Sequence, residues 1–487
     1  MASSTPTLWS LSLISSWHSR LTNETKLTRL FTSLDLLAQI QEQRGTSRWS
    51  TESISIDDRY MLLTKFQSAS YRPLYIVDIS SNEPTEPELI ILPNSTEKEE
   101  GTFSVNATFS RDPSKSHLVY LITNAYGDFK SVVTYDTQTR VVSHITTPVP
   151  NLHAIRPMSW ETENLKVTRE NILFRANVDG WSSLFVMPFS GPHKDTVIEV
   201  KPSWEGGDIS FMPNALNGKP NELVLKLKSY RSQGWLARLD LIAALHKVDR
   251  DERGKLFISP TLEEYRQASS GIPPFRTLPP KLVRYKSFDG LLIPVMYYHP
   301  NNRQSAAPLV INIHGGPENQ ATAQSRKSVF SILLFAGQRT DVPVSPIHGY
   351  LLNEMGCAVM YPNVRGSSGY GKAFLAADDV EKREDSVKDI GALLDHIDQN
   401  MKNELDSARI AVMGGSCRSL LFPLEYRVID YVSDGGYMVY ASLTHFSSKL
   451  ACGVANFGIA HWPSFLQNTA SHRRAARRLE YGDETDP

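Results

Sequence analysis

Cysteine is scarce in this sequence. Among its 487 residues only Cys357, Cys417 and Cys452 are cysteines. Three cysteines cannot form a disulfide framework, and no spacing of cysteine and histidine matches a zinc site, so we expect no bound metal. A chain of this kind is expected in a reducing compartment.

An excess of charge and long apolar runs are also absent. Lysine plus arginine number 51 and aspartate plus glutamate 52, for a formal net charge of -1. This balance gives no electrostatic reason to expect nucleic acid or an anionic membrane as a partner. The longest apolar run, 329–337, is too short to span a bilayer. The apolar patch 8–17 is interrupted by serines and follows no basic segment, so we predict no signal peptide and a cytoplasmic location.

The first half of the chain repeats pairs of short β-like runs. Four cycles of two apolar runs lie at 60–63 and 74–78, 118–121 and 131–136, 172–174 and 183–186, and 223–225 and 235–240. A cycle of about 40 to 50 residues has the size of a propeller blade. We therefore predict a β-propeller of about four or more blades over 51–268, with an antiparallel sandwich as the alternative. Residues 1–50 do not follow the pattern and stay unassigned.

The second half has a different pattern of apolar segments. Residues 269–281 contain four prolines and are typical of a linker. After the linker, strand-like and helix-like segments alternate over 282–487. Buried-strand runs lie at 309–313, 357–361 and 409–413, and the segment 385–397 has its apolar residues on one helical face. This alternation predicts an α/β domain with a mainly parallel sheet and helices on both faces.

Two glycine-containing turns follow predicted strands. His314-Gly315-Gly316-Pro317 follows the first strand, where glycine lets backbone N–H groups approach a developing oxyanion. Gly414-Gly415-Ser416 follows the third strand, the context of a nucleophilic serine on a strand–turn–helix elbow. However, Arg418 stands where the elbow pattern requires glycine, and either motif taken alone can be an ordinary turn. The glycine-rich loop 365–371 lacks the Lys-Ser/Thr ending of a phosphate loop.

Taken together, the motifs are more specific. The combination of 314–317, 361–371, 382–390 and 414–416 closely resembles the prolyl oligopeptidase family of serine peptidases, and within it the acylaminoacyl-peptidase and dipeptidyl-peptidase V branch. Members have an N-terminal β-propeller and a C-terminal α/β-hydrolase domain. The resemblance covers about residues 50 to 487 and is strongest from Lys281 onward.

The resemblance implies a function and a site. Ser416 would be the nucleophile, and the N–H of Cys417 and the backbone at Gly316 would form the oxyanion hole. The reaction would pass through an acyl-serine intermediate, with short peptides admitted through the propeller as substrates and no cofactor. An esterase or lipase on the same fold is the enzymatic alternative. The exact peptide bond and the oligomeric state are left open.

The chain departs from the family at two internal places. The family elbow reads Gly-Gly-Ser-Tyr-Gly-Gly, whereas here the 18 residues 417–434 replace the single tyrosine. An apolar segment, 326–344, likewise stands where the family has a compact loop. Both segments can be encoded with splice donor and acceptor sites that remove them in frame. We therefore hypothesise two retained introns, with genuine surface-loop insertions as the alternative.

A third departure concerns the acid and the base of the triad. In this fold they follow the nucleophile on later strands, and the 71 residues after Ser416 contain no such strands. His445, His461 and His472 are expected to be structural or surface residues. We therefore expect a truncated domain that is inactive as given. The non-enzymatic alternative is a pseudoenzyme that uses its propeller to bind.

Overall fold

The computed structural model describes most of the chain from residue 48 onward. The described ranges are 48–68, 71–80, 85–92, 103–147, 154–157, 160–203, 206–211, 222–230, 235–267, 278–300, 305–315, 319–323, 346–415, 434–456, 458–469 and 471–486. Within them the strands form five sheets.

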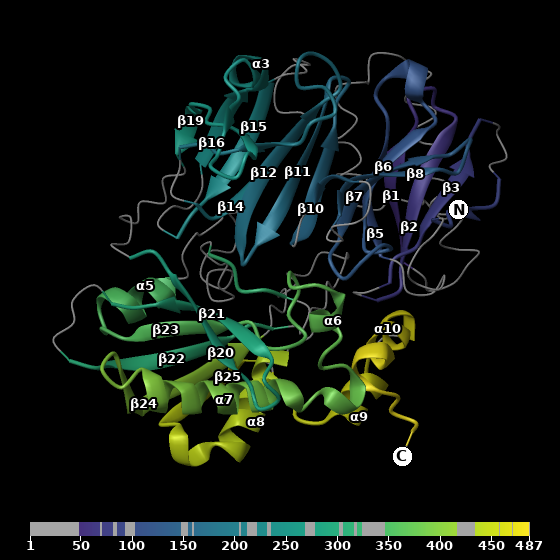
Figure 1. The fold of residues 1–487 in the computed structure, drawn as a ribbon. Coiled ribbons are helices and arrows are strands. Elements are labelled where there is room, and N and C mark those ends of the chain that lie inside the picture. Colours follow the sequence, from purple (N-terminus) through teal and green to yellow (C-terminus); the bar gives the residue numbers. More distant parts are fainter. Residues whose placement is uncertain are drawn as a thin grey trace, which may run out of the picture.

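Four largely antiparallel sheets follow one another along residues 48–267 (Figure 1). The first contains β1 (Arg48–Ile54), β2 (Tyr60–Phe66), β3 (Leu74–Asp78) and β4 (Glu88–Leu89). The second contains β5 (Ser104–Phe109), β6 (Leu118–Thr123), β7 (Ser131–Asp136), β8 (Val142–Thr147) and β9 (Ala154–Pro157). The third contains β10 (Glu161–Val167), β11 (Asn171–Val178), β12 (Trp181–Pro188), β13 (Ile198–Val200), β18 (Leu256–Ile258) and β17 (Asp249–Arg250). The fourth contains β14 (Asp208–Phe211), β15 (Glu222–Lys228), β16 (Trp235–Asp240) and β19 (Glu263–Gln267), with helix α3 (Leu241–Leu245) after β16.

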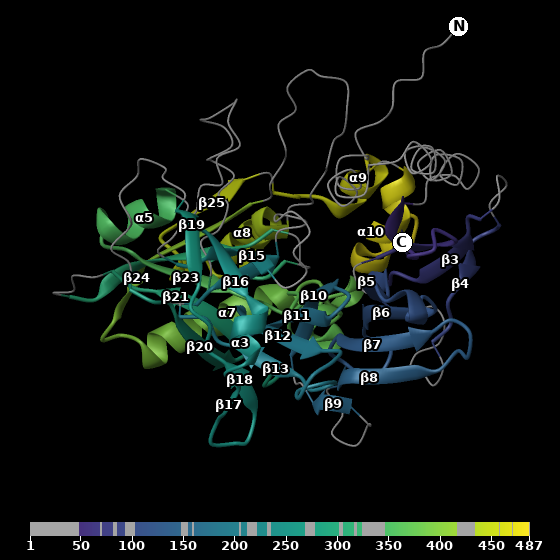
Figure 2. The same ribbon diagram turned by 90° about the horizontal axis from the view of Figure 1, so that it is seen from above.

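The four sheets are arranged as neighbouring propeller blades. The first strands of successive sheets contact one another, β1 with β5, β5 with β10, and β10 with β14. Apolar side chains fill the space between the sheets: Leu62 shares a cluster with Leu121, and Ile122 with Phe174. Seen from above, the sheet of β5–β9 lies beside that of β1–β4 (Figure 2). The predicted pairs of apolar runs are central strands of these sheets, each with a neighbouring strand on both sides. The predicted propeller is confirmed.

Residues 281–456 build the fifth sheet, in the order β20–β21–β23–β22–β24–β25. Its strands are β20 (Lys281–Lys286), β21 (Leu292–Tyr298), β22 (Ala307–Ile313), β23 (Ala358–Pro362), β24 (Leu405–Gly415) and β25 (Cys452–Asn456). The pairs that β22 makes with β23 and β24 are parallel, as is β24 with β25, whereas β20 and β21 are antiparallel additions at one edge. This is the predicted α/β-hydrolase sheet.

Helices cover both faces of the fifth sheet. The helices of this half are α5 (Pro346–Asn353), α6 (Lys372–Leu375), α7 (Asp385–Asn400), α8 (Asp434–His445), α9 (Trp462–Gln467) and α10 (Ser471–Tyr481). The apolar faces of α7 and α8 pack with Ile311 and Val412 on one side, and α5 packs through Leu352 with Val359 on the other. Figure 1 shows this α/β half below the propeller, with α6 where the two parts meet.

The predicted linker and N-terminal segment fall mainly on undescribed residues. Strand β1 begins at Arg48, three residues before the expected start of the propeller at 51. Residues 268–277, most of the expected linker 269–281, lie outside the described ranges. Among the helices that are described, none has the length and apolar character needed to cross a bilayer.

Candidate active site

The two glycine-containing motifs follow neighbouring parallel strands. Ile313, the last residue of β22, is paired with Gly414 near the end of β24. The chain leaves β22 to form β23 on one side and later returns to form β24 on the other. The gap between β22 and β24 is therefore the point at which the strand order reverses, and open α/β sheets bind ligands at the carboxyl ends of the strands there.

The N-terminus of α8 lies at the same place. A Cβ atom on Gly435 would lie 2.7 Å from the Ile313 carbonyl oxygen and 2.8 Å from the Gly415 nitrogen. A Cβ atom on Gly414 would overlap the Gly435 carbonyl oxygen. The end of β24 and the start of α8 are thus in direct backbone contact, which only glycine permits. A strand end and a helix N-terminus that meet in this way are the arrangement found at a nucleophile elbow.

The three residues predicted to carry the chemistry lie outside the described ranges. Ser416 and Cys417 follow directly after the last residue of β24, and Gly316 follows directly after the described turn at His314 and Gly315. The first interpreted insertion, 326–344, and residues 417–433 of the second insertion, 417–434, are also outside these ranges, whereas Asp434 begins α8. The roles of Ser416, Cys417 and Gly316 therefore stay predictions.

His314 is held by a serine from the neighbouring glycine-rich loop. The His314 Nε2 atom lies 3.1 Å from the Ser367 hydroxyl, and that hydroxyl donates its hydrogen to the Val364 carbonyl oxygen at 2.6 Å. Because the single hydroxyl hydrogen is already used, Ser367 accepts from His314, so Nε2 carries a proton. Through this hydrogen bond His314 ties the turn after β22 to the glycine-rich loop.

A buried ion pair holds the glycine-rich loop 365–371 at its first residue, Arg365. The Arg365 side chain is 4% exposed and donates from Nη2 to Asp389 at 2.9 Å and from Nη1 to Asp289 at 2.9 Å. Burial opposes the charge on Arg365, but these hydrogen bonds outweigh it and raise the pKa of Arg365. Asp389, on α7, also accepts from the Arg365 backbone N–H at 2.9 Å and from the Ser287 hydroxyl. The loop after β23 is therefore rigidly attached to α7 and to the turn after β20.

Three other histidines of this half contact neighbouring residues. His445 lies 3.8 Å from Glu384 on the surface, and the His461 ring accepts the Ser464 backbone N–H at the start of α9. The His348 ring is buried and lies 2.8 Å from the Tyr361 hydroxyl. The side chain of His472 is outside the described part. Within the described ranges, no group of three or more histidine, cysteine or acidic side chains is arranged to hold a metal ion.

Sequence reasoning missed the residues that hold this site. The sequence marks residues 365–371 as a glycine-rich loop and as part of the family resemblance, but it does not identify Arg365 and Ser367 as the main anchors of that loop. A signal was available in Asp389, an acidic residue on the otherwise apolar face of α7 next to Ile390. A buried charge on such a face requires a partner.

A sequence comparison links this half of the chain to known peptidases. The sequence model described as "Prolyl oligopeptidase family" matches residues 344–417. The uncharacterized peptidase YuxL of Bacillus subtilis is 27% identical over 183 residues, which are 36% of this chain and 24% of that protein. The matches relate the chain to the prolyl oligopeptidase family.

Solved structures agree on the fold. A puromycin hydrolase is similar over 90% of this chain and 57% of its own, with 14% identity and a TM-score of 0.66. Prolyl oligopeptidase B from Galerina marginata is similar over 92% of this chain and 53% of its own, with 16% identity and a TM-score of 0.64. The chain thus has the architecture of these two proteins and spans somewhat more than half of their length.

Proposed function

We propose that this relative of the prolyl oligopeptidase family is a serine-type peptidase, with Ser416 as its nucleophile and short peptides as its substrates. The N–H of Cys417 and the backbone at Gly316 would bind the oxyanion, and the acyl group would pass through Ser416. The domain limits that we propose are a propeller over 51–268, a linker over 269–281 and a peptidase domain over 282–487.

The observation that carries this proposal is the meeting of β22, β24 and α8. Gly435 packs against Ile313 and Gly415, so the two motifs and a helix N-terminus converge at the carboxyl end of the sheet. The helix dipole and the free N–H groups of its first turn favour negative charge there. A serine that follows Gly415 begins next to these groups, as a nucleophile of acyl transfer requires.

The same contact supports the hypothesis that 417–434 is an insertion. Gly414 and Gly435 already touch, so a turn of very few residues suffices to join β24 to α8. The match to the family also begins at 344 and ends at 417, the inner limits of the two segments that we interpret as retained introns. Splicing that joins the first base of codon 417 to the last two bases of codon 434 would leave one tyrosine codon, and the elbow would then read Gly-Gly-Ser-Tyr-Gly-Gly.

We expect the chain with both segments present to be inactive. Among the described residues, His314 is bound to Ser367, His348 to Tyr361 and His461 to the Ser464 N–H, so we assign none of these three as the base. The 17 additional residues would also change the path of the chain between Ser416 and α8, and with it the orientation of the Cys417 N–H. A serine without a base is a weak nucleophile at neutral pH.

A fluorophosphonate probe tests the assignment. The protein translated from the mature transcript should be labelled, with the label on the peptide that contains Ser416 and lost in Ser416→Ala. The 487-residue chain should react orders of magnitude more slowly. Labelling of another serine would refute Ser416 as nucleophile, and rapid labelling of Ser416 in the 487-residue chain would refute the expected inactivity.

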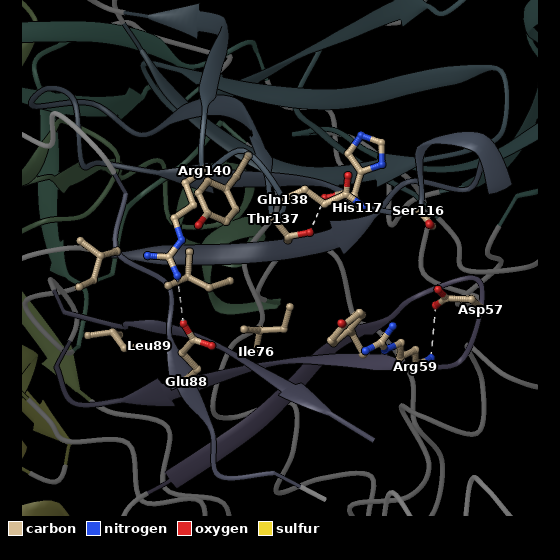
Figure 3. Close-up of a pocket in the computed structure, with 14 residues that line it drawn as sticks. Asp57, Arg59, Ile76, Glu88, Leu89, Ser116, His117, Thr137, Gln138 and Arg140 are labelled. Atoms are coloured by element: carbon tan, nitrogen blue, oxygen red, sulfur yellow. Dashed lines mark hydrogen bonds and ion pairs between the residues drawn. The ribbon is translucent and has the colours of Figure 1, made fainter. Parts of the chain in front are cut away.

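One observation favours the alternative, a non-catalytic binding protein. A cavity of about 390 Å³ lies between the first two sheets. Figure 3 shows Arg140 and Glu88 at one end of it and Arg59 and Asp57 at the other. It opens among the β1–β2, β5–β6 and β7–β8 connections, at the end of the sheets opposite to the β6–β7 connection that faces the α/β half. Peptide binding to the 487-residue chain that is unchanged in Ser416→Ala and lost in Arg140→Glu would favour this alternative.

A further inference from the structure

We propose that two propeller-side contacts position the turn at His314 and Gly315, with Asn177 and Gln320 as the positioning residues. The contacts act through residues 319–323, here called the bridge segment, which separates that turn from the propeller. The inference rests on the proposed function in one respect, because this turn would lie beside the oxyanion of the proposed acyl transfer.

The bridge segment holds the turn directly. The Asn319 side chain donates from Nδ2 to the Gly315 carbonyl oxygen. The Asn319 carbonyl oxygen in turn accepts the Ser368 backbone N–H at 3.1 Å. Since Ser367 accepts from His314 Nε2, the turn is held on both sides by one continuous hydrogen-bonded unit. A displacement of the bridge segment therefore moves the Gly315 carbonyl and the peptide that follows it.

The middle of the bridge segment is fixed to the α/β half. The buried Asn363 side chain donates from Nδ2 to the Ala321 carbonyl oxygen at 3.0 Å and accepts the Ala321 N–H at 2.6 Å. Asn363 thus pairs with the segment as a neighbouring strand would. This pairing sets the register of the segment but leaves its other edge to the propeller.

The propeller occupies that other edge through the β11–β12 hairpin. Asn177 donates from Nδ2 to Gln320 Oε1 at 2.6 Å, and the Ala323 N–H donates to the Gly180 carbonyl oxygen at 3.0 Å. A Cβ atom on Gly180 would lie 3.0 Å from the Thr322 Cα atom, and its φ of +84° also favours glycine. The hairpin therefore lies in close backbone contact with the bridge segment.

Asn177 is itself held rigidly. Its Nδ2 group also donates to Glu163 at 3.1 Å, and its Oδ1 atom accepts the Gly180 N–H at 2.9 Å. Both donors and the acceptor of this amide are thus used, so the group cannot turn without breaking a bond. Asn177 fixes the Gln320 side chain in one place relative to the hairpin.

The propeller holds the adjoining loop at a second point. Asp128, in the β6–β7 connection, accepts the Ala373 N–H at 2.7 Å, and its carbonyl oxygen accepts the Lys372 N–H at 3.0 Å. These contacts lie at α6, where the two parts meet in Figure 1. The loop that carries Ser367 is therefore clamped from the second sheet while the bridge segment is clamped from the third.

A conservative change at Gln320 tests the inference by hydrogen exchange. Gln320→Met keeps the length of the side chain and removes the acceptor for Asn177. We expect the amides of His314 and Gly315 to exchange about fivefold faster, the factor that corresponds to a hydrogen bond of about 1 kcal/mol. Gln320→Glu retains an acceptor oxygen and should restore the slow exchange, and the amides of β20 and β21 should be unchanged.

The matched control is Arg284→Ala. Arg284 and Asp179 form an ion pair between β20 and the β11–β12 hairpin, and neither partner belongs to the bridge segment. Its removal should leave exchange at His314 and Gly315 unchanged. An equal increase in both variants, or none in Gln320→Met, would overturn the inference. The measurement needs no turnover, so a failure of Ser416 to react with the probe would refute the proposed function without affecting this result.

Discussion

The two carboxylates that bind Arg365 offer a sharp test of how this half of the protein is stabilised. Asp389 is 0% exposed and Asp289 is 41% exposed, yet both accept hydrogen bonds of about the same length from the same guanidinium group. The two carboxylates thus share one cationic partner and differ in burial, and Asp389 accepts further hydrogen bonds from the Arg365 N–H and the Ser287 hydroxyl. Replacing each by asparagine removes one charge and keeps the shape of the side chain.

The expected effects differ because solvent can replace one partner and not the other. Asp389→Asn leaves the buried Arg365 charge without its inner counter-charge, and breaking a buried pair destabilises by about 3–5 kcal/mol. Asp289→Asn leaves water to solvate the outer edge of the guanidinium group, and an exposed pair contributes at most about 1 kcal/mol. The Arg365 guanidinium also stacks on Phe288, 4.6 Å from the ring centroid, and this contact survives in both variants.

Urea unfolding measures the difference. Hydrogen exchange of the β22 and β23 amides at increasing urea concentration reports the unfolding of the α/β half alone, because the two parts of the chain need not unfold together. The urea concentration at the midpoint of this transition should fall strongly for Asp389→Asn and only slightly for Asp289→Asn. Adding Arg365→Met to Asp389→Asn should recover part of the loss, since no buried charge is then unpaired. Equal losses for the two single variants would refute the reasoning.

Three further predictions concern pH and association. Burial lowers the pKa of His348 to about 3 from an ordinary 6.5. Its neutral ring therefore contributes stability that is complete above pH 6.5 and is lost, by up to about 5 kcal/mol, as the pH falls toward 3. In acid-unfolding curves His348→Gln should reduce the dependence of the free energy of unfolding on pH, and an unchanged dependence would contradict the assignment. Burial raises the pKa of Asp379 to about 6 from 3.8, so the folded state holds an unfavourable charge above pH 6. Asp379→Asn should therefore raise the free energy of unfolding in urea by about 1 kcal/mol at pH 7.5, after allowance for its partial exposure, and leave it unchanged at pH 4. Within the described sheet β25 pairs only with β24 and Val454 is 52% exposed, so in sedimentation velocity the chain should self-associate and Val454→Lys should reduce it; a monomer at all concentrations would contradict this.

Much of the architecture was predictable because burial leaves a direct mark on the sequence. The run 235–240 predicted β16, and 409–413 predicted the apolar part of β24, because strands with neighbours on both sides are apolar. The segment 385–397 predicted α7, whose helix continues to Asn400. The periodicity of these segments is local, so it is readable without knowledge of the partner.

The contacts between distant segments could not be predicted in the same way. The pairing of β13 with β18 joins residues far apart in the sequence, and neither short strand has a marked pattern. Asp128 has the composition of an ordinary turn residue, and its contact with Ala373 depends on how the propeller sits on the α/β half. Asn177 and Gln320 are likewise polar residues whose partners only the tertiary structure supplies.

In the candidate site, too, the local features were predictable and the contacts between distant residues were not. The sequence predicted a strand before His314 and another before the Gly414-Gly415-Ser416 turn, and β22 and β24 lie there. The pairing of Ile313 with Gly414, which makes these strands neighbours, was not predicted. The contact between Gly414 and Gly435 was not predictable from motifs, because 20 residues separate the two glycines in the sequence. Ser416, Cys417 and Gly316 lie outside the described residues, and their roles stay predictions.

Sequencing the mature transcript across codons 410 to 440 tests the central claim most directly. The account holds that β24 and α8 belong to one tight elbow at Ser416, so the message should join the codon of Ser416 to a single tyrosine codon followed by those of Gly435 and Gly436. A message that retains all codons from 417 to 434 would contradict the account, and binding by the propeller would then become the leading function.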